Sequence, residues 1–444
     1  MSGAANGDFL KVDDLNLRRN SFTFSCWIKP NGIQEDYSGI FSTQDDNTSL
    51  ILNFLNGDNT IGFHPTWWWS SGLRATPDEW SHVALVSNGS QVKIYVNGEE
   101  SVNNTTLSSQ VVSKIDLGRY GRGYSSRYTN LEMDEVSIWN RPLSIDEIRQ
   151  WRHLTKTDIT DPIFTGLVAY YQFNESNGNI SINKTSNTNY ASYFGVSASN
   201  HIASNAPVFN GKSEKININS AGTKDFSTTG LSMNFANGMY PNGDVWVSTG
   251  TIDPDVLPDA LQYFNSYAII NNYGQNQTFT SLESMTFTGN SEYYISSAND
   301  YNLYKRNSND FGDSWGSILD TGDAITGTGG ANTLISFSTG LMVSSFSQFV
   351  LSNNDSSLSV NEELAIKNPI IYPNPLTKDS NLSITIPSGW EDSTLIVYNL
   401  LGQKISQASL IKGENILKLN TDSGIYNIVI FNSKHKLTKK LILN

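Results

Sequence analysis

Short runs in which apolar and polar residues alternate recur along the chain, and turn residues interrupt them roughly every 8 to 12 positions. Alternation places every second side chain on the same face of a strand, so such runs bury one face and expose the other. Only 38% of the residues are apolar and 16% are charged, so much of the polarity comes from uncharged side chains. This composition is typical of turn-rich β-structure and fits helical bundles poorly. The sequence therefore predicts an all-β protein built from sandwiches.

Length and charge narrow the class of protein further. With 444 residues the chain is long enough for about three domains. Its formal net charge of −13 argues against a nucleic-acid partner, because such proteins need a basic surface to displace counterions. No run of about 18 apolar residues occurs, so no transmembrane segment is predicted. The single cysteine, Cys26, excludes an intramolecular disulfide, and none of the five histidines is spaced as a pair of zinc ligands.

Changes in composition and in strand pattern divide the chain into five segments. We expect a jelly roll over 1–154, a connecting segment over 155–205, a second β-sandwich over 206–353, a linker over 354–368 and a small Ig-like β-sandwich over 369–444. The connecting segment is dense in Asn, Ser and Thr, and the linker is small and polar, which is typical of loops and tethers.

Two details of the first segment predict local structure. Cys26 shares a strand face with Phe24 and Ile28, so we expect its thiol to be a small buried group. Ser144 and Glu147 have the spacing of a capping box, which predicts a short helix beginning after Ser144.

Four short motifs follow one another in the last segment. They are Tyr372-Pro373-Asn374-Pro375, Val397–Gln403, Ser423–Tyr426 and Thr438–Leu443. In this order, ending at the C-terminus of the chain, they resemble the C-terminal sorting domain of substrates of the type IX secretion system of Bacteroidetes. The residues that carry the sorting motif are Tyr372, Pro373, Asn374, Pro375, Gly402, Gly424, Tyr426, Lys439 and Lys440. The alternative is an ordinary Ig-like module with similar turns.

The residue types in these motifs also have a plain structural interpretation. Pro373 and Pro375 fix φ and remove two hydrogen-bond donors, so we expect them to end a strand in a rigid turn. Gly402 and Gly424 are expected in turns where φ is positive.

The resemblance implies that residues 369–444 are an address for export. It implies recognition by the type IX machinery at the outer membrane, followed by cleavage of this domain and release of the protein or its attachment to surface lipopolysaccharide. It also implies an N-terminal signal peptide, and the sequence around Met1 has neither the basic nor the apolar region of one. We therefore expect a secreted or cell-surface protein whose export signal lies upstream of Met1.

The first segment resembles the laminin-G-like, concanavalin A-like jelly roll. The resemblance is carried by Phe22–Pro30, Trp80–Val86, Val92–Gly98, Leu117-Gly118 and Met133–Ser144. It covers about residues 8–152 and implies the fold far more strongly than a function, since this fold hosts lectins, adhesins, hydrolases and spacers. The family has a full strand before the position of Asp8, which is absent here, so the domain is expected to be truncated at its N-terminus. The run Leu167–Phe173 either supplies a missing strand or leads into the next domain.

A pair of carboxylates raises the question of catalysis. Some enzymes on this jelly roll cleave β-glucans with three carboxylates at alternate positions of one strand, which places them on one face. Glu132 and Asp134 occupy the first two of these positions, but the third is Val136. We therefore expect no enzymatic activity.

Calcium is the cofactor that the resemblance implies. In similar domains an acidic residue before the last strand helps to hold a structural Ca²⁺ near the first strand. Asp134 has that position, and Asp8 and Asp13 lie near the first strand. Ca²⁺ takes six to eight oxygen ligands, so these carboxylates together with backbone carbonyls could form a site. The alternative is that these acids are solvated turn residues.

Aromatic residues mark the expected ligand site. Trp67, Trp68 and Trp69 follow one another, and alternation cannot send all three into one core. An exposed indole is a flat apolar platform on which a sugar ring can stack. Arg119 and Tyr124 belong to a second polar and aromatic loop. The alternatives are a core or interdomain role for the tryptophans and a plain turn for the loop.

Together these features predict a non-catalytic exported protein that binds or adheres, with glycans or surface polysaccharide as its ligand and the jelly roll as the binding domain. The alternative is a structural spacer or stalk from a larger surface protein. A glycoside hydrolase is a third, less favoured interpretation.

Overall fold

The computed structural model divides into two compact units, Met1–Asn354 and Asp355–Asn444. The residues that it describes are 7–43, 50–64, 69–121, 127–156, 161–175, 178–186, 189–195, 201–250, 254–256, 258, 262–288, 297–306, 314–326, 333–353, 369–377, 380–387, 390–419, 421–432 and 435–443. In this part of the chain, none of the helices has the length and apolar character needed to span a bilayer.

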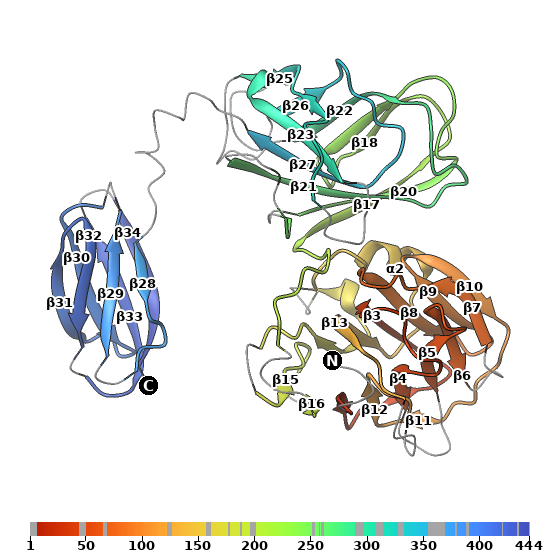
Figure 1. The fold of residues 1–444 in the computed structure, drawn as a ribbon, viewed down its shortest axis with the longest axis horizontal. Coiled ribbons are helices and arrows are strands. Elements are labelled where there is room, and N and C mark those ends of the chain that lie inside the picture. The colour runs from red at the N-terminus through yellow and green to blue at the C-terminus, as the bar shows by residue number, and fades with distance from the viewer. Residues whose placement is uncertain are drawn as a thin grey trace. The chain divides into compact units, whose positions relative to one another are not determined.

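The first unit begins with a jelly roll of two facing sheets (Figure 1). One sheet contains, in spatial order, β15 (Ile180–Ser181), β16 (Ala191–Phe194), β1 (Phe9–Val12), β12 (Ile115–Leu117), β4 (Gly39–Thr43), β5 (Ile51–Leu55), β6 (Thr60–His64) and β7 (Trp69–Arg74). The other contains β10 (Glu99–Asn103), β9 (Val92–Val96), β8 (Ser81–Ser87), β3 (Phe22–Pro30), β13 (Leu131–Trp139) and β14 (Leu167–Tyr171). A separate short pair joins β11 (Val111–Val112) to β2 (Leu17–Arg18). The prediction of a concanavalin A-like, all-β fold is confirmed.

The space between the two sheets is a continuous apolar core. Cys26 and Ile28 from β3 and Val136 and Ile138 from β13 are fully buried in it. The thiol of Cys26 is free, as predicted, and burial raises its pKa. Val136 therefore packs in the core at the position where a third carboxylate would be needed for glucan hydrolysis.

Helix α2 (Ile145–Trp151) follows β13 and begins with the predicted capping box. The Ser144 hydroxyl accepts a hydrogen bond from the Glu147 amide at 3.2 Å, and the Ser144 amide donates to the Glu147 carboxylate at 2.8 Å. A short 3-10 helix, η1 (Pro162–Phe164), precedes β14. Phe164 and Ile148 pack on Trp139, so this segment covers the outer face of the sheet.

The segment 155–205 is not a connection but a part of the jelly roll. β14 pairs with β13 through Tyr171 and Val136, and β16 pairs with β1 through Tyr193 and Leu10. These strands extend one edge of each sheet, so the run Leu167–Phe173 does supply a missing strand. Their pairing partners lie far away in the sequence, and β15 and β16 are short, which is why local pattern alone assigns the segment to loops.

The second sandwich also consists of two sheets. The first contains β17 (Gly211–Ile218), β20 (Gly243–Gly250), β21 (Gln262–Asn272), β27 (Gln348–Asn353), β23 (Tyr301–Arg306) and β24 (Asp320–Thr321). The second contains β18 (Gly222–Phe226), β19 (Leu231–Phe235), β22 (Leu282–Thr288), β26 (Leu334–Phe337) and β25 (Ala324–Thr326), and the 3-10 helix η4 (Ala298–Asp300) precedes β23. Their facing side chains form a second apolar core that includes Met233, Phe287 and Phe349.

A buried polar junction joins the jelly roll to the second sandwich. The guanidinium of Arg152 donates to the Asn97 carbonyl at 2.9 Å, to the Asn271 side chain at 3.2 Å and to the Tyr273 hydroxyl at 3.0 Å. The His153 ring lies 2.9 Å from the amide nitrogen of Asn271. Because Arg152, His153 and Asn271 are buried, their hydrogen bonds fix the contact between the two sandwiches.

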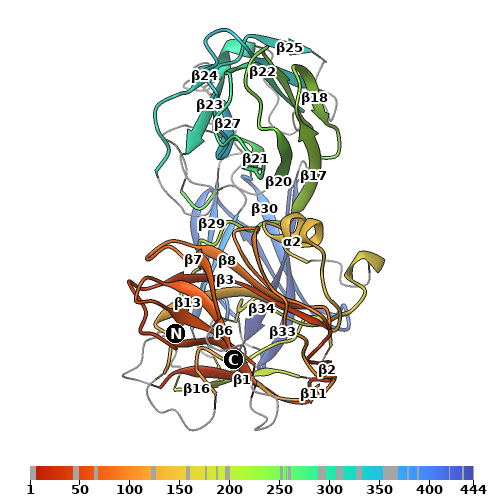
Figure 2. The same ribbon diagram turned by 90° about the vertical axis from the view of Figure 1, so that its right-hand side faces the viewer.

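Apolar and charged contacts complete this junction. Leu154 and Phe209 form a buried cluster with Ile269 of β21. Helix α2 contacts β17 and β20, as Figure 2 shows. The Lys215 ammonium of β17 lies 2.7 Å from the Asp146 carboxylate of α2.

The second unit is a small sandwich with its own core. One sheet contains β28 (Ile370–Tyr372), β29 (Asn381–Ile386) and β32 (Gly413–Lys418). The other contains β31 (Lys404–Leu410), β30 (Ser393–Asn399), β33 (Gly424–Phe431) and β34 (Lys436–Leu443). Trp390, Leu395 and Ile428 are among the side chains buried between them.

The predicted sorting motif is tied to the last strand of this unit. The Asn374 side chain donates to the Lys440 carbonyl at 2.7 Å and accepts from the Ile442 amide at 3.0 Å. The Pro373 and Pro375 residues flank Asn374 just after β28, where they end the strand as expected. The segment before β29 is thereby fastened to β34.

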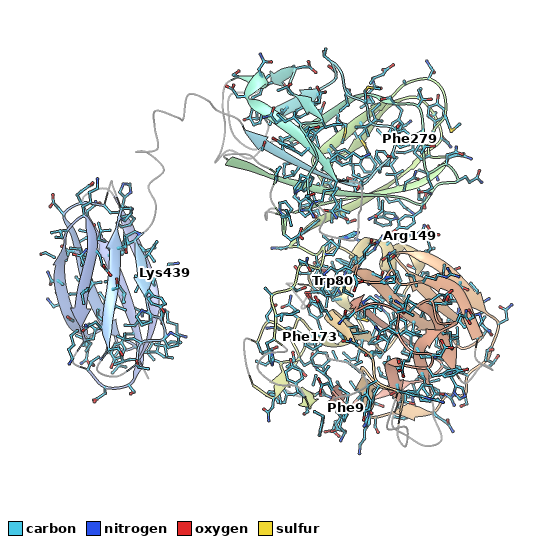
Figure 3. All side chains as sticks on the ribbon, viewed as in Figure 1. Phe9, Trp80, Arg149, Phe173, Phe279 and Lys439 are labelled. Carbon is cyan, nitrogen blue, oxygen red and sulfur yellow. The ribbon has the colours of Figure 1, made fainter. Side chains whose placement is uncertain are left out.

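The remaining motif residues show one error of prediction. Gly402 has a φ of +77°, as a turn requires, but Gly424 is the first residue of β33 and lacks a positive φ. Its backbone pairs with Leu443 in the ladder between β33 and β34, so a glycine is not needed there for a positive φ. Tyr426 is buried and donates from its hydroxyl to the Asp422 carbonyl at 2.7 Å. Lys439 and Lys440 are exposed on β34, and Figure 3 labels the first of them.

Candidate functional site

A pocket opens where the two sheets of the jelly roll meet at their β1–β16 and β13–β14 edges. We call it the edge pocket, and its volume is about 390 Å³. It is lined by Leu10, Trp80, Glu132, Met133, Asp134, Gln172, Phe173, Asn174, Glu175, Tyr193, His201, Ile202, Ala203 and Ser204. The volume falls within the usual range of small-molecule sites, about 300 to 1,000 Å³.

Aromatic rings form part of the wall of the edge pocket. Trp80 and Phe173 lie on the same side of the jelly roll in Figure 3. Trp80 is 1% exposed and donates from its indole nitrogen to the Asn205 side chain at 2.7 Å, which holds the segment 201–205 against the domain. Phe173 and Tyr193 are only partly buried and pack against the edge of the core, so their rings can contact a ligand.

Three carboxylates line the pocket, and each has partners within the protein. Glu132 pairs with the Lys29 ammonium at 2.9 Å. The Glu175 carboxylate accepts from the Ser181 hydroxyl and from the Ile182 amide, both at 2.9 Å.

The third carboxylate, that of Asp134, accepts a hydrogen bond from the Glu135 amide at 2.7 Å and another from the Ser204 hydroxyl. Asp134 is 7% exposed, and this burial raises the pKa of its carboxyl.

His201 lines the pocket and has a buried ring nitrogen without a described hydrogen-bond partner. Its Nδ1 lies 2.8 Å from the Glu175 carbonyl, which can only accept, so the proton of the neutral ring is on Nδ1. Its Nε2 is buried and has no hydrogen-bond partner among the described residues. The ring packs edge-on against Tyr193, with their centroids 5.3 Å apart. A donor on a ligand, such as a hydroxyl, would satisfy the Nε2 lone pair.

A buried polar network lies behind the pocket. Glu135 sits at an irregularity of β13 with a φ of +52°, and its carboxylate accepts from the Tyr170 hydroxyl and from the Gln172 amide nitrogen. The same Gln172 nitrogen donates to the Tyr170 hydroxyl at 3.1 Å. The Lys156 ammonium lies 4.9 Å from the centre of the Tyr170 ring. Gln172 also lines the pocket, so this network positions one of its polar side chains.

The Glu135 carboxyl should give the jelly roll a measurable dependence of stability on pH. Burial raises its pKa from 4.5 to about 7. Between these two values the unfolded chain has released the proton and the folded chain still holds it, so the free energy of unfolding falls as the pH rises. This contribution is fully present below about pH 4.5 and is lost as the pH passes about 7.

We expect Glu135→Gln to remove this decrease of the free energy of unfolding with rising pH. The amide keeps hydrogen-bonding atoms for Tyr170, and loss of the carboxylate lowers the pKa of buried Lys156 further, which acts in the same direction. In chemical unfolding, the stability of the variant relative to wild type should rise by about 1 to 3 kcal/mol from pH 5 to pH 8. Glu35→Gln, at an exposed position, is the control and should show no such trend. A difference in stability between Glu135→Gln and wild type that does not change with pH would contradict the raised pKa of Glu135.

The residues predicted to bind a ligand do not gather at the edge pocket. Trp67, Trp68 and Tyr124 lie outside the described residues. Trp69 begins β7, at the opposite edge of its sheet, and is partly buried against the core. The Arg119 guanidinium lies 2.5 Å from the Asp116 carboxylate and 3.7 Å from the centre of the Phe9 ring, so it is committed to internal contacts.

The three carboxylates predicted to hold calcium are separately engaged. Asp134 lines the edge pocket, Asp13 pairs with the Lys11 ammonium at 3.0 Å, and Asp8 is buried at the start of β1. Within the described ranges, no three His, Cys, Asp or Glu side chains are grouped in a way that could hold a metal ion. Calcium binding through Asp134 and backbone oxygens stays a prediction.

Local pattern did not point to most of the pocket. Trp80 was singled out only as part of a fold motif, and Gln172, Tyr193 and His201 lie in the segment expected to be a loop. One signal was present: the strand-like run that includes Ala169, Tyr170 and Tyr171 is too apolar for a connection and indicates an additional sheet edge.

Comparison with known families agrees with this architecture. Residues 4–149 match the model of the concanavalin A-like lectin/glucanases superfamily. Residues 370–444 match the model of the secretion system C-terminal sorting domain. The chain therefore carries a laminin-G-like domain at its start and a type IX sorting domain at its end, and the protein is exported to the cell surface or the extracellular space.

No curated protein matches the chain in sequence. Among solved structures, a Bacteroides ovatus protein named as a proposed carbohydrate-binding protein is similar, with 18% identity and a TM-score of 0.35 over 42% of this chain and 55% of that one. A heptameric SAP-like pentraxin from Limulus polyphemus has 17% identity and a TM-score of 0.29 over 34% of this chain and 78% of that one. Domain 4 of an extracellular arabinanase from Geobacillus stearothermophilus, in complex with arabinotriose, has 21% identity and a TM-score of 0.26 over 31% of this chain and 68% of that one. This chain spans about half the length of the first of these structures.

Proposed function

We propose that this exported protein is a non-catalytic binding or adhesion protein for glycans and that the edge pocket is its binding site. The observation that carries the proposal is the composition of that pocket. Partly exposed rings of Phe173 and Tyr193 stand beside hydrogen-bonding groups, among them the Nε2 lone pair of His201 and the carboxylate of Asp134. A sugar presents apolar C–H faces and hydroxyl groups together, and such a mixed wall complements both.

The carboxylates of the edge pocket do not form the set that glucan hydrolysis uses. Glu132 and Asp134 both line the pocket, but the irregularity of β13 after Asp134 places Val136, where the pattern would need a third carboxylate, in the core. The Glu132 carboxylate is engaged by the Lys29 ammonium at 2.9 Å. Incubation of the full chain with labelled polysaccharides should release no reducing ends. If wild type releases reducing ends and Asp134→Asn does not, the edge pocket is a catalytic site and the proposal of a binding protein is wrong.

Tyr193→Ala tests the binding site. The ring forms one wall of the edge pocket, so we expect its loss to weaken glycan binding at least tenfold, which is about 1.4 kcal/mol. The measurement is a glycan array probed with the full chain, with Ca²⁺ and with chelator, followed by titration of each glycan that binds.

Tyr190→Ala is the matched control, because Tyr190 lies just before β16 and is exposed away from the pocket lining. It should bind as wild type does. Equal losses in both variants would place the site elsewhere. Absence of binding to any glycan would favour the alternative, a structural spacer.

A further inference from the structure

We infer that the edge pocket takes the terminal residue of an uncharged glycan and rejects acidic sugars, an inference that rests on the proposed function. It follows from the closed base of the pocket, from the balance of acceptors over donors and from the charge of its wall.

The pocket has a closed base and a mouth. Leu10, Trp80 and Asp134 line it and are almost completely buried, so they close it on the side of the core. Ile202 is 59% exposed, and Ala203 and Ser204 are also exposed, so this segment borders the mouth. A polymer that runs through a site needs a groove open at two ends, whereas a pocket with a closed base admits a chain end more readily. Its volume of about 390 Å³ is near the small end of ligand sites and suits a short sugar.

The wall offers acceptors to a ligand that donates. The Nε2 of His201 has no described partner, and the carboxylate of Asp134 receives two hydrogen bonds, fewer than its oxygens can accept. The Gln172 side chain uses its nitrogen toward Glu135 and Tyr170, so its oxygen is the atom that remains to accept from a ligand. Hydroxyl groups donate to all three kinds of acceptor, while a carboxylate on a sugar can donate to none.

The charge of the pocket wall also favours a neutral sugar over an acidic one. Glu132, Asp134 and Glu175 place three carboxylates around the pocket, and Glu132 is paired with the ammonium of Lys29. Burial already disfavours the charged form of Asp134, as the raised pKa of its carboxyl indicates. A uronic or sialic acid would add another negative charge to this partly buried site, where like charges repel far more strongly than in water.

A cationic ligand is less well matched than a neutral one. Each of the three carboxylates already has a cationic or hydrogen-bonding partner, so none is a desolvated anion that needs a positive charge. An amino sugar is therefore an outcome of the test and not the expected ligand.

The test uses the full chain and a panel of oligosaccharides that end in glucose, galactose, mannose or N-acetylglucosamine. Each hexose end is paired with the corresponding uronic acid, and each oligosaccharide is also presented with an additional sugar that blocks its end. Glucosamine ends are included as the cationic probe. We expect the uronic acids and the blocked chains to bind at least tenfold more weakly than the free neutral ends at pH 7.

Two substitutions assign these effects to the pocket. His201→Phe keeps the ring against Tyr193 but removes Nε2, and it should weaken binding of neutral ends about tenfold. His64→Phe, in β6 near the opposite edge of the eight-stranded sheet, is its control and should bind as wild type. In Asp134→Asn, the ratio of the affinity for neutral ends to the affinity for uronic acids should fall at least threefold. If that variant does not fold, Glu132→Gln, at a more exposed position, should lower this ratio as well.

The outcomes separate this inference from the proposed function. Glycan binding in which uronic acids or blocked chains equal the free neutral ends would overturn the inference and leave the proposed function intact. Stronger binding of glucosamine ends would overturn the assignment of a neutral ligand. No binding to any member of the panel would remove the proposed function, and the inference with it.

Discussion

Deletion of residues 369–444 should abolish delivery to the cell surface and leave the rest of the protein in the periplasm. The deleted segment is the sorting domain, and it forms part of a compact unit with its own core, so its removal leaves the folding of the first unit unaffected. The measurement is the distribution of the protein between periplasm, outer surface and medium in a bacterium with a type IX system. The protein must be expressed there behind a signal peptide for the inner membrane.

A point variant makes this expectation sharper. Asn374→Ala removes the two hydrogen bonds that fasten the Pro-Asn-Pro turn to the carbonyl of Lys440 and the amide of Ile442. We expect it to reduce surface delivery severalfold. His201→Phe, which alters the pocket alone, should be exported as wild type. Normal surface delivery of the truncated chain would show that residues 369–444 are not the address.

Replacement of Arg152 by Met should lower the free energy of unfolding of the first unit by about 2 to 4 kcal/mol. The guanidinium is buried and donates to Asn97, Asn271 and Tyr273 at the junction of the two sandwiches. Met has a similar length but donates no hydrogen bond, so the buried Asn271 side chain and the half-buried Asn97 carbonyl and Tyr273 hydroxyl each lose a donor. The expected readout is a lower calorimetric transition temperature, together with separation of the two sandwiches into distinct transitions.

Arg149→Met is the matched control at the same junction. Arg149 is only partly buried; its guanidinium stacks 3.8 Å from the Tyr273 ring and donates to the Gly98 carbonyl at 3.1 Å. Its loss should cost about 1 kcal/mol or less, because a partly exposed cation–π contact is weak and water replaces the lost hydrogen bond. If the two variants are equally stable, the buried hydrogen bonds of Arg152 do not hold the junction together.

The junction matters for the proposed function because the edge pocket depends on the segment that leads into it. Residues 201–205 line the pocket or are fastened to Trp80, and the chain then continues to Pro207, whose carbonyl lies 2.8 Å from the His153 ring. A loosened junction would therefore disturb the wall of the pocket. Arg152→Met should weaken glycan binding in parallel with its loss of stability, while Arg149→Met should not.

Much of the architecture was predictable because its signals are local. Alternation places Cys26 in the core, and the Ser144 and Glu147 pair begins a helix through contacts made within one turn. The sorting motif is likewise a set of short turn sequences in a fixed order. These features depend on the backbone geometry of neighbouring residues, which the sequence specifies directly.

Tertiary structure decided the rest. Whether residues 167–194 form strands depends on the edges of β13 and β1, which come from distant parts of the chain. The edge pocket unites Leu10, Asp134 and His201, and no spacing rule relates residues so far apart. The conspicuous Trp69 packs on the core, while the less conspicuous His201 has a ring nitrogen without a described hydrogen-bond partner. Local sequence sets the period and the turns of each strand, but only the pairing of distant edges encloses a pocket and determines which polar atoms lack a partner.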